Sequence, residues 1–189
     1  MVIDDATLID QALSGDPESF GELVKKYQDR LYNTVVRFVG CRVEAEDVVQ
    51  DAFVQAFVKL DTFQHNSAFY TWLYRIAFNV AVSRSRKKRP GLSIDHARDL
   101  TGNDPVDPTE SPTEHLEREE RAAQVHAGLA RLSEEHRTIL VLREMEGFCY
   151  DTIADIIDVP VGTVRSRLHR ARMQLRDELK EVLQVDPSA

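Results

Sequence analysis

Five arginines gather near the C-terminus of the chain with no acidic residue between them. They are Arg165, Arg167, Arg170, Arg172 and Arg176. A guanidinium group forms paired hydrogen bonds with a phosphate or with the edge of a guanine, so this segment favours a nucleic acid as partner. Solvated helix faces normally mix both signs of charge, and an arginine-only face is therefore less typical of a bare surface.

A second basic segment without acids lies in the first half of the chain. Its bases are Arg75, Arg84, Arg86, Lys87, Lys88 and Arg89. On a helix, steps of four, four and three residues place donors in a row on one face, which suits the backbone of a duplex. That row is Arg75, Asn79, Ser83 and Arg86. Two basic segments predict two contacts with one long polyanion.

Aromatic side chains precede this second segment. The turn at 61–66 contains Phe63, His65 and Asn66, and Phe69 and Trp72 follow it. Because every base offers a flat face, stacking on an aromatic ring contributes about 1–3 kcal/mol to the binding of an unstacked nucleotide. For Trp72 taken alone, packing in a helical core is the more common role.

Acidic residues are concentrated between the two basic segments. The chain has 189 residues and a net charge of −8. Residues 90–120 hold nine acids and two bases, whereas residues 1–89 hold twelve of each. The stretch has little apolar periodicity and is predicted to be an acidic, poorly ordered linker. Two interpretations stay open: a solvated spacer, or an acidic strap that lies in a basic groove of a partner.

The first half of the chain predicts a helical domain. Asp16, Pro17 and Glu18 form a typical helix start, with a cap, a proline at the first position and an acid in the first turn. This helix is predicted to end near Gly40. A shorter helix, around 8–13, is predicted to precede it. Its apolar stripe is Phe20, Leu23, Val24, Tyr27, Leu31, Val35 and Phe38.

Two more helices are predicted, over 45–60 and from Ser67 onward. The apolar side of the first consists of Ala45, Val49, Ala52, Phe53, Ala56 and Phe57. Its opposite side is polar and consists of Glu46, Asp47, Gln50, Asp51 and Gln55. Without further context, such a stripe is most simply a solvated face. The second helix is predicted to bury Trp72, Leu73, Ile76, Ala77 and Val80.

The second half of the chain predicts a helix-turn-helix. Ser133 is a typical cap for a helix that contains Ile139 and Leu140. Residues 150–157 then form a short helix, and after a turn Thr163 caps the next one. The inner faces are predicted to be Ile153, Ala154 and Ile157, then Val164, Leu168 and Leu175. The outward positions include Arg165, Ser166, His169 and Arg170. An interaction-only helix hairpin is the alternative interpretation.

Other features narrow the class of protein. No apolar stretch approaches the roughly 20 residues of a spanning helix, and the N-terminus is acidic where a secretory signal is basic. A cytoplasmic protein without membrane insertion is expected. Cys41 and Cys149 lack the spacing of metal ligands, so both are expected to be reduced and partly buried, with no metal site. The chain has no phosphate loop or nucleophile motif that would indicate catalysis or a cofactor.

Three motifs in this order, with the acidic segment between the second and the third, are characteristic. They are AEDVVQDAF (45–53), FYTWLYRIAFN (69–79) and EGFCYDTIADIIDVPVGTVRSRLHRAR (146–172). Together they resemble the extracytoplasmic-function (ECF) group of bacterial RNA polymerase sigma factors. The resemblance covers nearly the whole chain.

The resemblance implies an all-α protein with two small helical domains and no enzymatic activity of its own. Residues 1–90 would form sigma region 2, 91–115 an acidic flexible linker, 116–183 sigma region 4 with its helix-turn-helix, and 184–189 a disordered tail. Such a protein would bind core RNA polymerase, recognise the minus-ten and minus-thirty-five elements of promoter DNA and help to melt the duplex. Many relatives are held inactive by an anti-sigma factor.

The resemblance also implies three sets of site residues. The set for core polymerase is Glu46, Asp47, Gln50, Asp51 and Gln55. The set for the minus-ten element and its flipped base is Phe63, His65, Asn66, Ser67, Trp72, Arg75, Asn79 and Arg86. The set for the minus-thirty-five element is Thr163, Arg165, Ser166, Arg167, His169, Arg170 and Arg172.

The chain departs from the family pattern around the helix-turn-helix. Cys149 and Thr152 stand where the family has the Ser and Glu of a capping box, so a softer helix start is expected. Asp158 replaces the glycine often found at the turn, and Asp tolerates a left-handed backbone better than most residues.

Two other functional classes remain to be weighed. A free-standing helix-turn-helix regulator would be a symmetric dimer that reads a palindrome. An enzyme would need a catalytic constellation, and the acids at 46–51 would need ligands from a second helix to hold a metal ion.

Overall fold

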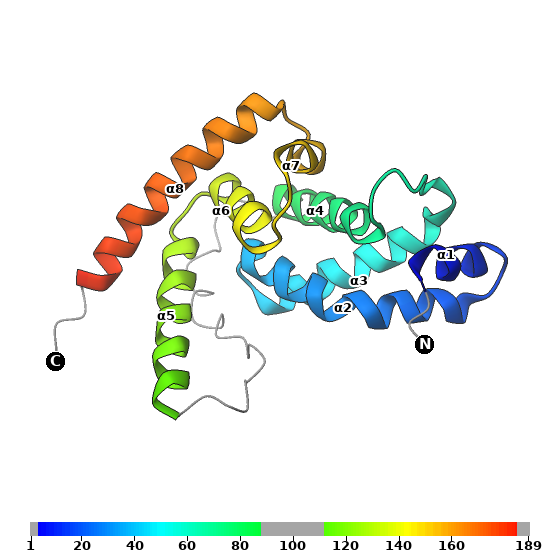
Figure 1. Cartoon of the computed structure of the whole chain (residues 1–189), viewed down its shortest axis with the longest axis horizontal. Helices are drawn as coiled ribbons and strands as arrows, with labels where there is room; N and C mark the ends of the chain where they lie inside the picture. The colour runs from blue at the N-terminus through cyan, green and yellow to red at the C-terminus, as the bar shows by residue number, and fades with distance from the viewer. Residues whose placement is uncertain (1–3, 88–111, 185–189) are drawn as a thin grey trace. The chain divides into compact units, whose positions relative to one another are not determined.

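The computed structural model describes residues 4–87 and 112–184, and every regular element within these ranges is a helix (Figure 1). The expected all-α class is therefore confirmed. The chain divides into two compact units. The first contains α1 (Asp5–Leu13), most of α2 (Pro17–Val39), α3 (Arg42–Val58), the short η1 (Leu60–Thr62) and α4 (Phe69–Lys87).

The second unit contains α5 (Pro112–Ala130), α6 (Glu134–Leu140), the π-helical turn η2 (Val141–Met145), α7 (Tyr150–Ile157) and α8 (Val161–Gln184). Helix α5 begins at Pro112, a few residues before the predicted end of the linker. Most of the linker predicted over 91–115 and nearly all of the tail predicted over 184–189 lie outside the described residues.

The predicted start and end of α2 are confirmed. The Asp16 carboxylate accepts a hydrogen bond from the backbone N–H of Glu18 at 3.1 Å and another from the Ser19 hydroxyl at 2.7 Å. Pro17 is the first helical residue, where its missing N–H costs nothing. Gly40 has a φ of +79°, a left-handed backbone that glycine adopts freely and that stops the helix.

Side chains from α2 hold the first unit together. Tyr70 of α4 stacks on Tyr27 with ring centroids 5.6 Å apart, and the Arg30 guanidinium covers the Tyr70 ring at 4.0 Å. Phe57 of α3 meets Phe20 edge-on at 5.0 Å. Although Phe57 was predicted to be inside, it is 49% exposed, because it lies in the last turn of α3.

Helix α4 buries the face that its sequence predicts. Leu73, Ile76, Ala77 and Val80 are buried, while Trp72 is half-buried. Tyr74 is completely buried and was not predicted, since tyrosine does not by itself distinguish core from surface.

In the second unit, α8 packs against α5, α6 and α7. Ser133 caps α6 as predicted, since its hydroxyl accepts the His136 N–H. Helix α7 has the predicted limits, and Val164 and Leu168 of α8 are buried.

Two inner positions of the helix-turn-helix were assigned wrongly. Ile156 and Ala171 are buried, whereas Ile157 and Leu175 are only half-buried. The predicted cap at Thr163 is also wrong, because α8 already begins at Val161. The carbonyl of Pro160 accepts the N–H of Thr163 at 2.8 Å, which places Thr163 in the first turn.

Asp158 ends α7 in the predicted left-handed conformation, with φ 54° and ψ 55°. The next N–H, of Val159, donates to the carbonyl of Ala154 at 3.1 Å, the long-range bond of a Schellman motif. This turn sets the angle between the two helices of the motif.

Replacing Asp158 tests how much the turn depends on its backbone. We expect Asp158→Val to lower the free energy of unfolding by about 1–2 kcal/mol, because a β-branched residue is strained in a left-handed conformation. Asp158→Gly should be at least as stable as the original chain, since glycine adopts this conformation freely. Urea unfolding measures both; equal loss in both variants would contradict the explanation.

Candidate nucleic-acid and protein interfaces

The polar stripe predicted on α3 is exposed. Glu46, Asp47, Gln50 and Gln55 are exposed and Asp51 is half-exposed. Two of these five residues are already engaged by the protein itself. Arg84 of α4 donates to Oδ2 of Asp47 at 2.9 Å and to Oδ2 of Asp51 at 2.6 Å. The hydrogen bond with Asp51 is the largest contribution that raises the pKa of Arg84.

Arg84 therefore points away from the row that the sequence predicts to face DNA, and toward α3. It follows Leu73, Ala77 and Val80 at helical spacing and lies on the same side of the helix as these buried residues. Arg75, Asn79 and Ser83 are exposed, as predicted. The side chains of Arg86 and Lys87, together with Lys88 and Arg89, lie outside the described residues.

An open groove between α2 and α3 borders the polar stripe and was not predicted. Apolar side chains of both helices line it, namely Val24, Tyr32, Val49, Phe53 and Val54. Its polar lining residues are Gln28, Asp29, Glu46 and Gln50. Tyr32 lies outside the predicted stripe of α2, and Val54 lies outside the predicted apolar side of α3. On each helix, an apolar residue outside the predicted stripe was therefore the sequence signal for this surface.

The turn before α4 divides the predicted minus-ten residues by burial. Phe63 is 8% exposed, and its ring lies 5.2 Å from Trp72 and 4.7 Å from His65. His65, Asn66 and Ser67 are exposed. His65 has a left-handed backbone with φ 55°, a feature that the sequence did not indicate. The structure thus brings Phe63, His65 and Trp72 together, with Phe63 as the buried support.

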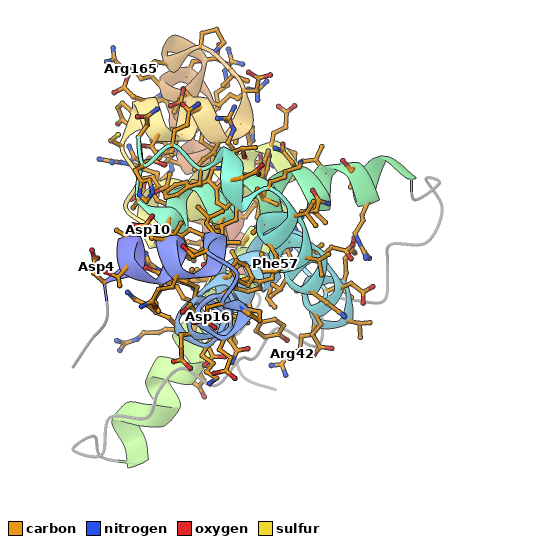
Figure 2. All side chains as sticks on the ribbon, turned by 90° about the vertical axis from the view of Figure 1, so that its right-hand side faces the viewer. Asp4, Asp10, Asp16, Arg42, Phe57 and Arg165 are labelled. Carbon is orange, nitrogen blue, oxygen red and sulfur yellow. The ribbon has the colours of Figure 1, made fainter. Side chains whose placement is uncertain are left out.

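The predicted residues of α8 also divide into two groups. Arg165, which Figure 2 labels, is exposed on the outward face, and Ser166, His169 and Arg170 are exposed as well. Arg167 and Thr163 are half-buried. Arg167 pairs with Glu135 at 3.5 Å, and the Nε of Arg172 donates to Glu144 at 2.9 Å.

A tyrosine that the sequence did not single out lies beside the outward face of α8. The ring of Tyr150, the first residue of α7, has the guanidinium of Arg165 at 5.8 Å and that of Arg143 at 5.0 Å. A cation over an aromatic face is attracted by the ring, so Tyr150 restricts the orientation of Arg165. The guanidinium of Arg143 is itself held in place, because its Nη1 donates a hydrogen bond to the Phe148 carbonyl at 2.8 Å.

Cys149 occupies the position just before α7 and is exposed, so the expectation that it is partly buried is wrong. Cys41 is half-buried, as expected. As expected, the helix start lacks a side-chain cap bond. The sulfur instead lies 3.1 Å from the Thr152 hydroxyl, and hydrogen bonds from the side chain and backbone of Thr152 lower the pKa of the Cys149 thiol.

Neither a metal cluster nor a membrane span is found in the described parts of the chain. No group of three His, Cys, Asp or Glu side chains within 4–87 and 112–184 could hold a metal ion. No helix among the same residues is long and apolar enough to cross a bilayer.

Comparison with known proteins agrees with this arrangement. Residues 23–90 match the model of sigma-70 region 2, and residues 122–175 match that of sigma-70 region 4. The RNA polymerase sigma-H factor of Pseudomonas aeruginosa is 41% identical over 184 residues, which cover 95% of each chain. The ECF RNA polymerase sigma-E factor of Escherichia coli is 36% identical over 185 residues, 95% of this chain and 96% of the relative.

Two solved structures are similar to this chain in fold. CnrH in complex with the cytosolic domain of CnrY has a TM-score of 0.62 at 28% identity, over 97% of this chain and 99% of that one. The sigma factor RpoE in complex with the anti-sigma factor NepR from Bartonella quintana has a TM-score of 0.66 at 26% identity. The match covers 90% of this chain and 99% of that one.

The fold and these matches define a promoter-specificity subunit of RNA polymerase rather than an enzyme. The chain belongs to the ECF family of RNA polymerase sigma factors. As a sigma factor it binds core RNA polymerase and promoter DNA, which excludes both the palindrome-reading dimer and the enzyme considered above.

The lowered pKa of Cys149 predicts its reactivity. In a Cys41→Ser background, the alkylation rate should rise with pH around a midpoint below that of an ordinary thiol, because the thiolate is stabilised. Thr152→Val should move this midpoint to higher pH by removing the hydroxyl hydrogen bond. Iodoacetamide kinetics from pH 6 to 10 measure both; identical midpoints would contradict the assignment.

Proposed function

We propose that this sigma factor divides its work between the two helical units as follows. Residues 1–90 dock on core polymerase and open the minus-ten element, and residues 116–183 read the minus-thirty-five element. The observation that carries the proposal is the segregation of exposed groups. An acidic and polar stripe faces outward on α3, and an acid-free basic face is exposed on the first turns of α8.

For core polymerase, the proposed surface is the polar stripe together with the groove beside it. Glu46 and Gln50 belong to both. Acidic groups at the rim of an apolar groove suit a basic, amphipathic partner helix, since the groove buries apolar area and the rim selects the charge. Asp47, Asp51 and Gln55 extend the same surface along α3.

For the minus-ten element, the proposed contacts follow the division by burial. His65, Asn66 and Ser67 contact the flipped base. The buried Phe63 packs against His65, and the half-buried Trp72 offers the exposed part of its ring for stacking. Arg75, Asn79 and Arg86 bind the strand backbone. Because an extruded base must be held by several groups at once, the strained turn at His65 belongs to the proposed pocket.

For the minus-thirty-five element, the exposed and the paired residues of α8 take different roles. Arg165, Ser166, His169 and Arg170 reach base edges in the major groove. The hydroxyl of Ser166 donates to the Thr163 carbonyl at 3.0 Å, so its oxygen faces DNA as an acceptor. Thr163, Arg167 and Arg172 lie at the flank and contact phosphates.

The acidic segment 91–115 is proposed to lie as a strap in a basic channel of the polymerase. Its charge would repel DNA from the free chain, so that specific binding requires the polymerase to hold the strap. The site of action is therefore the cytoplasm, where the polymerase works.

Control by an anti-sigma factor is proposed from the relatives. Two solved structures similar to this chain are complexes, one of them with a named anti-sigma factor. A protein that covers the groove on α2 and α3 would exclude the core. If the chain purified from its source is always free and constitutively active, this part of the proposal fails.

Run-off transcription on a randomised promoter library, with core polymerase from the same source, tests the proposed function. The chain should select templates that share two boxes in an asymmetric arrangement. Selection of palindromes, or start sites identical with and without the chain, would overturn it.

Arg165→Ala tests base reading by α8. We expect a loss of about tenfold in transcription from the preferred minus-thirty-five sequence, and a smaller loss from templates with a mutated box, because a bidentate arginine contributes roughly 1–3 kcal/mol of discrimination. Arg176→Ala is the matched control on the same helix; its guanidinium is paired with the neighbouring Asp177 at 2.9 Å. Equal losses on both templates would contradict base reading.

His65→Gly and Phe63→Ala separate the contact from its support. His65→Gly keeps the left-handed turn and removes the ring, so the melting temperature should stay unchanged while the holoenzyme binds a minus-ten single strand about tenfold more weakly. Phe63→Ala should lower the free energy of unfolding by about 3 kcal/mol. Fluorescence anisotropy and thermal unfolding give the two readouts; unchanged strand binding for His65→Gly would remove it from the site.

A further inference from the structure

Arg84 joins the two functional helices of the first unit. Its Nε and Nη2 both donate to Oδ2 of Asp51, at 3.1 and 2.6 Å, and its Nη1 donates to Oδ2 of Asp47 at 2.9 Å. Asp47 and Asp51 are four residues apart on α3 and therefore lie on one face of it. One guanidinium thus spans both carboxylates of the polar stripe.

The arrangement leaves half of each carboxylate available. All three hydrogen bonds of Arg84 end on Oδ2. The side chains of Asp47 and Asp51 remain 54% and 47% exposed, against 35% for Arg84. Among the described residues, no other hydrogen bond to either carboxylate is formed. Oδ1 of each can therefore accept from an incoming partner without breaking the bonds to Arg84.

Arg84 is also the charged end of an otherwise apolar helix face. Arg84 follows the buried residues Leu73, Ala77 and Val80 on the same face of the helix. The packing of α4 therefore fixes the direction in which the Arg84 side chain leaves the helix. Without it, two like charges one turn apart would repel each other, and each carboxylate would turn freely in solvent. With it, both are held in one orientation before a partner arrives.

We infer that Arg84 is a positioning residue for docking on core RNA polymerase: it orients Asp47 and Asp51 toward basic groups of the core. The inference rests on the proposed docking surface on α3. It also links the two tasks of the unit, because the same helix that presents Arg75 and Asn79 on its exposed side fixes the docking carboxylates from its buried side.

Arg84→Lys tests geometry at constant charge. A lysine is a point charge on a flexible stem and does not hold two carboxylates with a planar fork. In the lysine variant, Asp47 and Asp51 would lose their rotational freedom only when core polymerase binds. The lost conformational entropy of these two side chains corresponds to roughly a tenfold weaker Kd. The matched control is Arg176→Lys, an exposed arginine paired with the single carboxylate of Asp177.

The measurement is anisotropy of the labelled full chain titrated with core polymerase, alongside its thermal unfolding. Arg84→Lys should weaken core binding about tenfold with a melting temperature close to the original, while Arg176→Lys changes neither. In an Asp47→Asn, Asp51→Asn background, Arg84→Lys should cause no further loss, because it acts through those two carboxylates.

The outcomes separate this inference from the docking proposal. If the double Asn variant binds core as tightly as the original chain, the docking surface is wrong and the inference falls with it. If the double variant is weakened but Arg84→Lys is not, the surface stands and Arg84 is not a positioning residue. Tighter binding by Arg84→Lys would show that Arg84 competes with the core, which also overturns the inference.

Discussion

Helix α4 has one face that is completely excluded from water, and the arrangement of the first unit depends on it. Leu73, Tyr74 and Ala77 have no exposed surface. Their burial fixes the rotation of the helix about its axis, since turning it would expose apolar area at about 25 cal/mol per Å². Arg75 and Asn79 must then point outward, and Arg84 must point toward α3. The separation of the proposed DNA-binding row from the proposed docking surface follows from this packing.

The same principle orders the second unit. Val164, Leu168 and Ala171 bury one side of α8, and this leaves an outward face with arginines. Within the described part of the chain, acidic residues of neighbouring elements then pair with some of those arginines and leave others without such a partner. Glu135 and Glu144 hold Arg167 and Arg172 at the flanks, whereas Arg165 is oriented by a tyrosine ring and keeps its charge uncompensated by these acids. This division matches the proposed roles, in which the central arginine reads bases and the paired arginines at the flanks bind phosphates.

Local signals explain which elements the sequence predicted well. Asp16, Pro17 and Gly40 determine the limits of α2 through a cap, a fixed φ and a left-handed backbone, all of which act within one turn. The left-handed turn at Asp158 was predicted correctly because it too depends only on a local backbone preference. Thr163 was misassigned as a cap because the helix already begins two residues earlier, at Val161, and the proline just before it was read only as part of the turn.

Features that depend on two elements were harder to predict. The direction of Arg84 follows from its spacing to Leu73, Ala77 and Val80, a signal that was present but was outweighed by the basic residues around it. The cation–π contact of Arg165 with Tyr150, the groove beside Val54 and the buried role of Phe63 require knowledge of which helices are neighbours. The motifs identified the family, and the structure assigned direction to their side chains.

In the proposed function, core polymerase confers specific DNA binding on a chain whose acidic segment opposes that binding when the chain is alone. The most direct test is the affinity of one promoter duplex for the free chain and for the chain with core, at the same salt concentration and against a scrambled duplex. We expect weak, indiscriminate binding by the free chain and tight binding to the promoter only in the presence of core. Tight, sequence-specific binding by the free chain would contradict it.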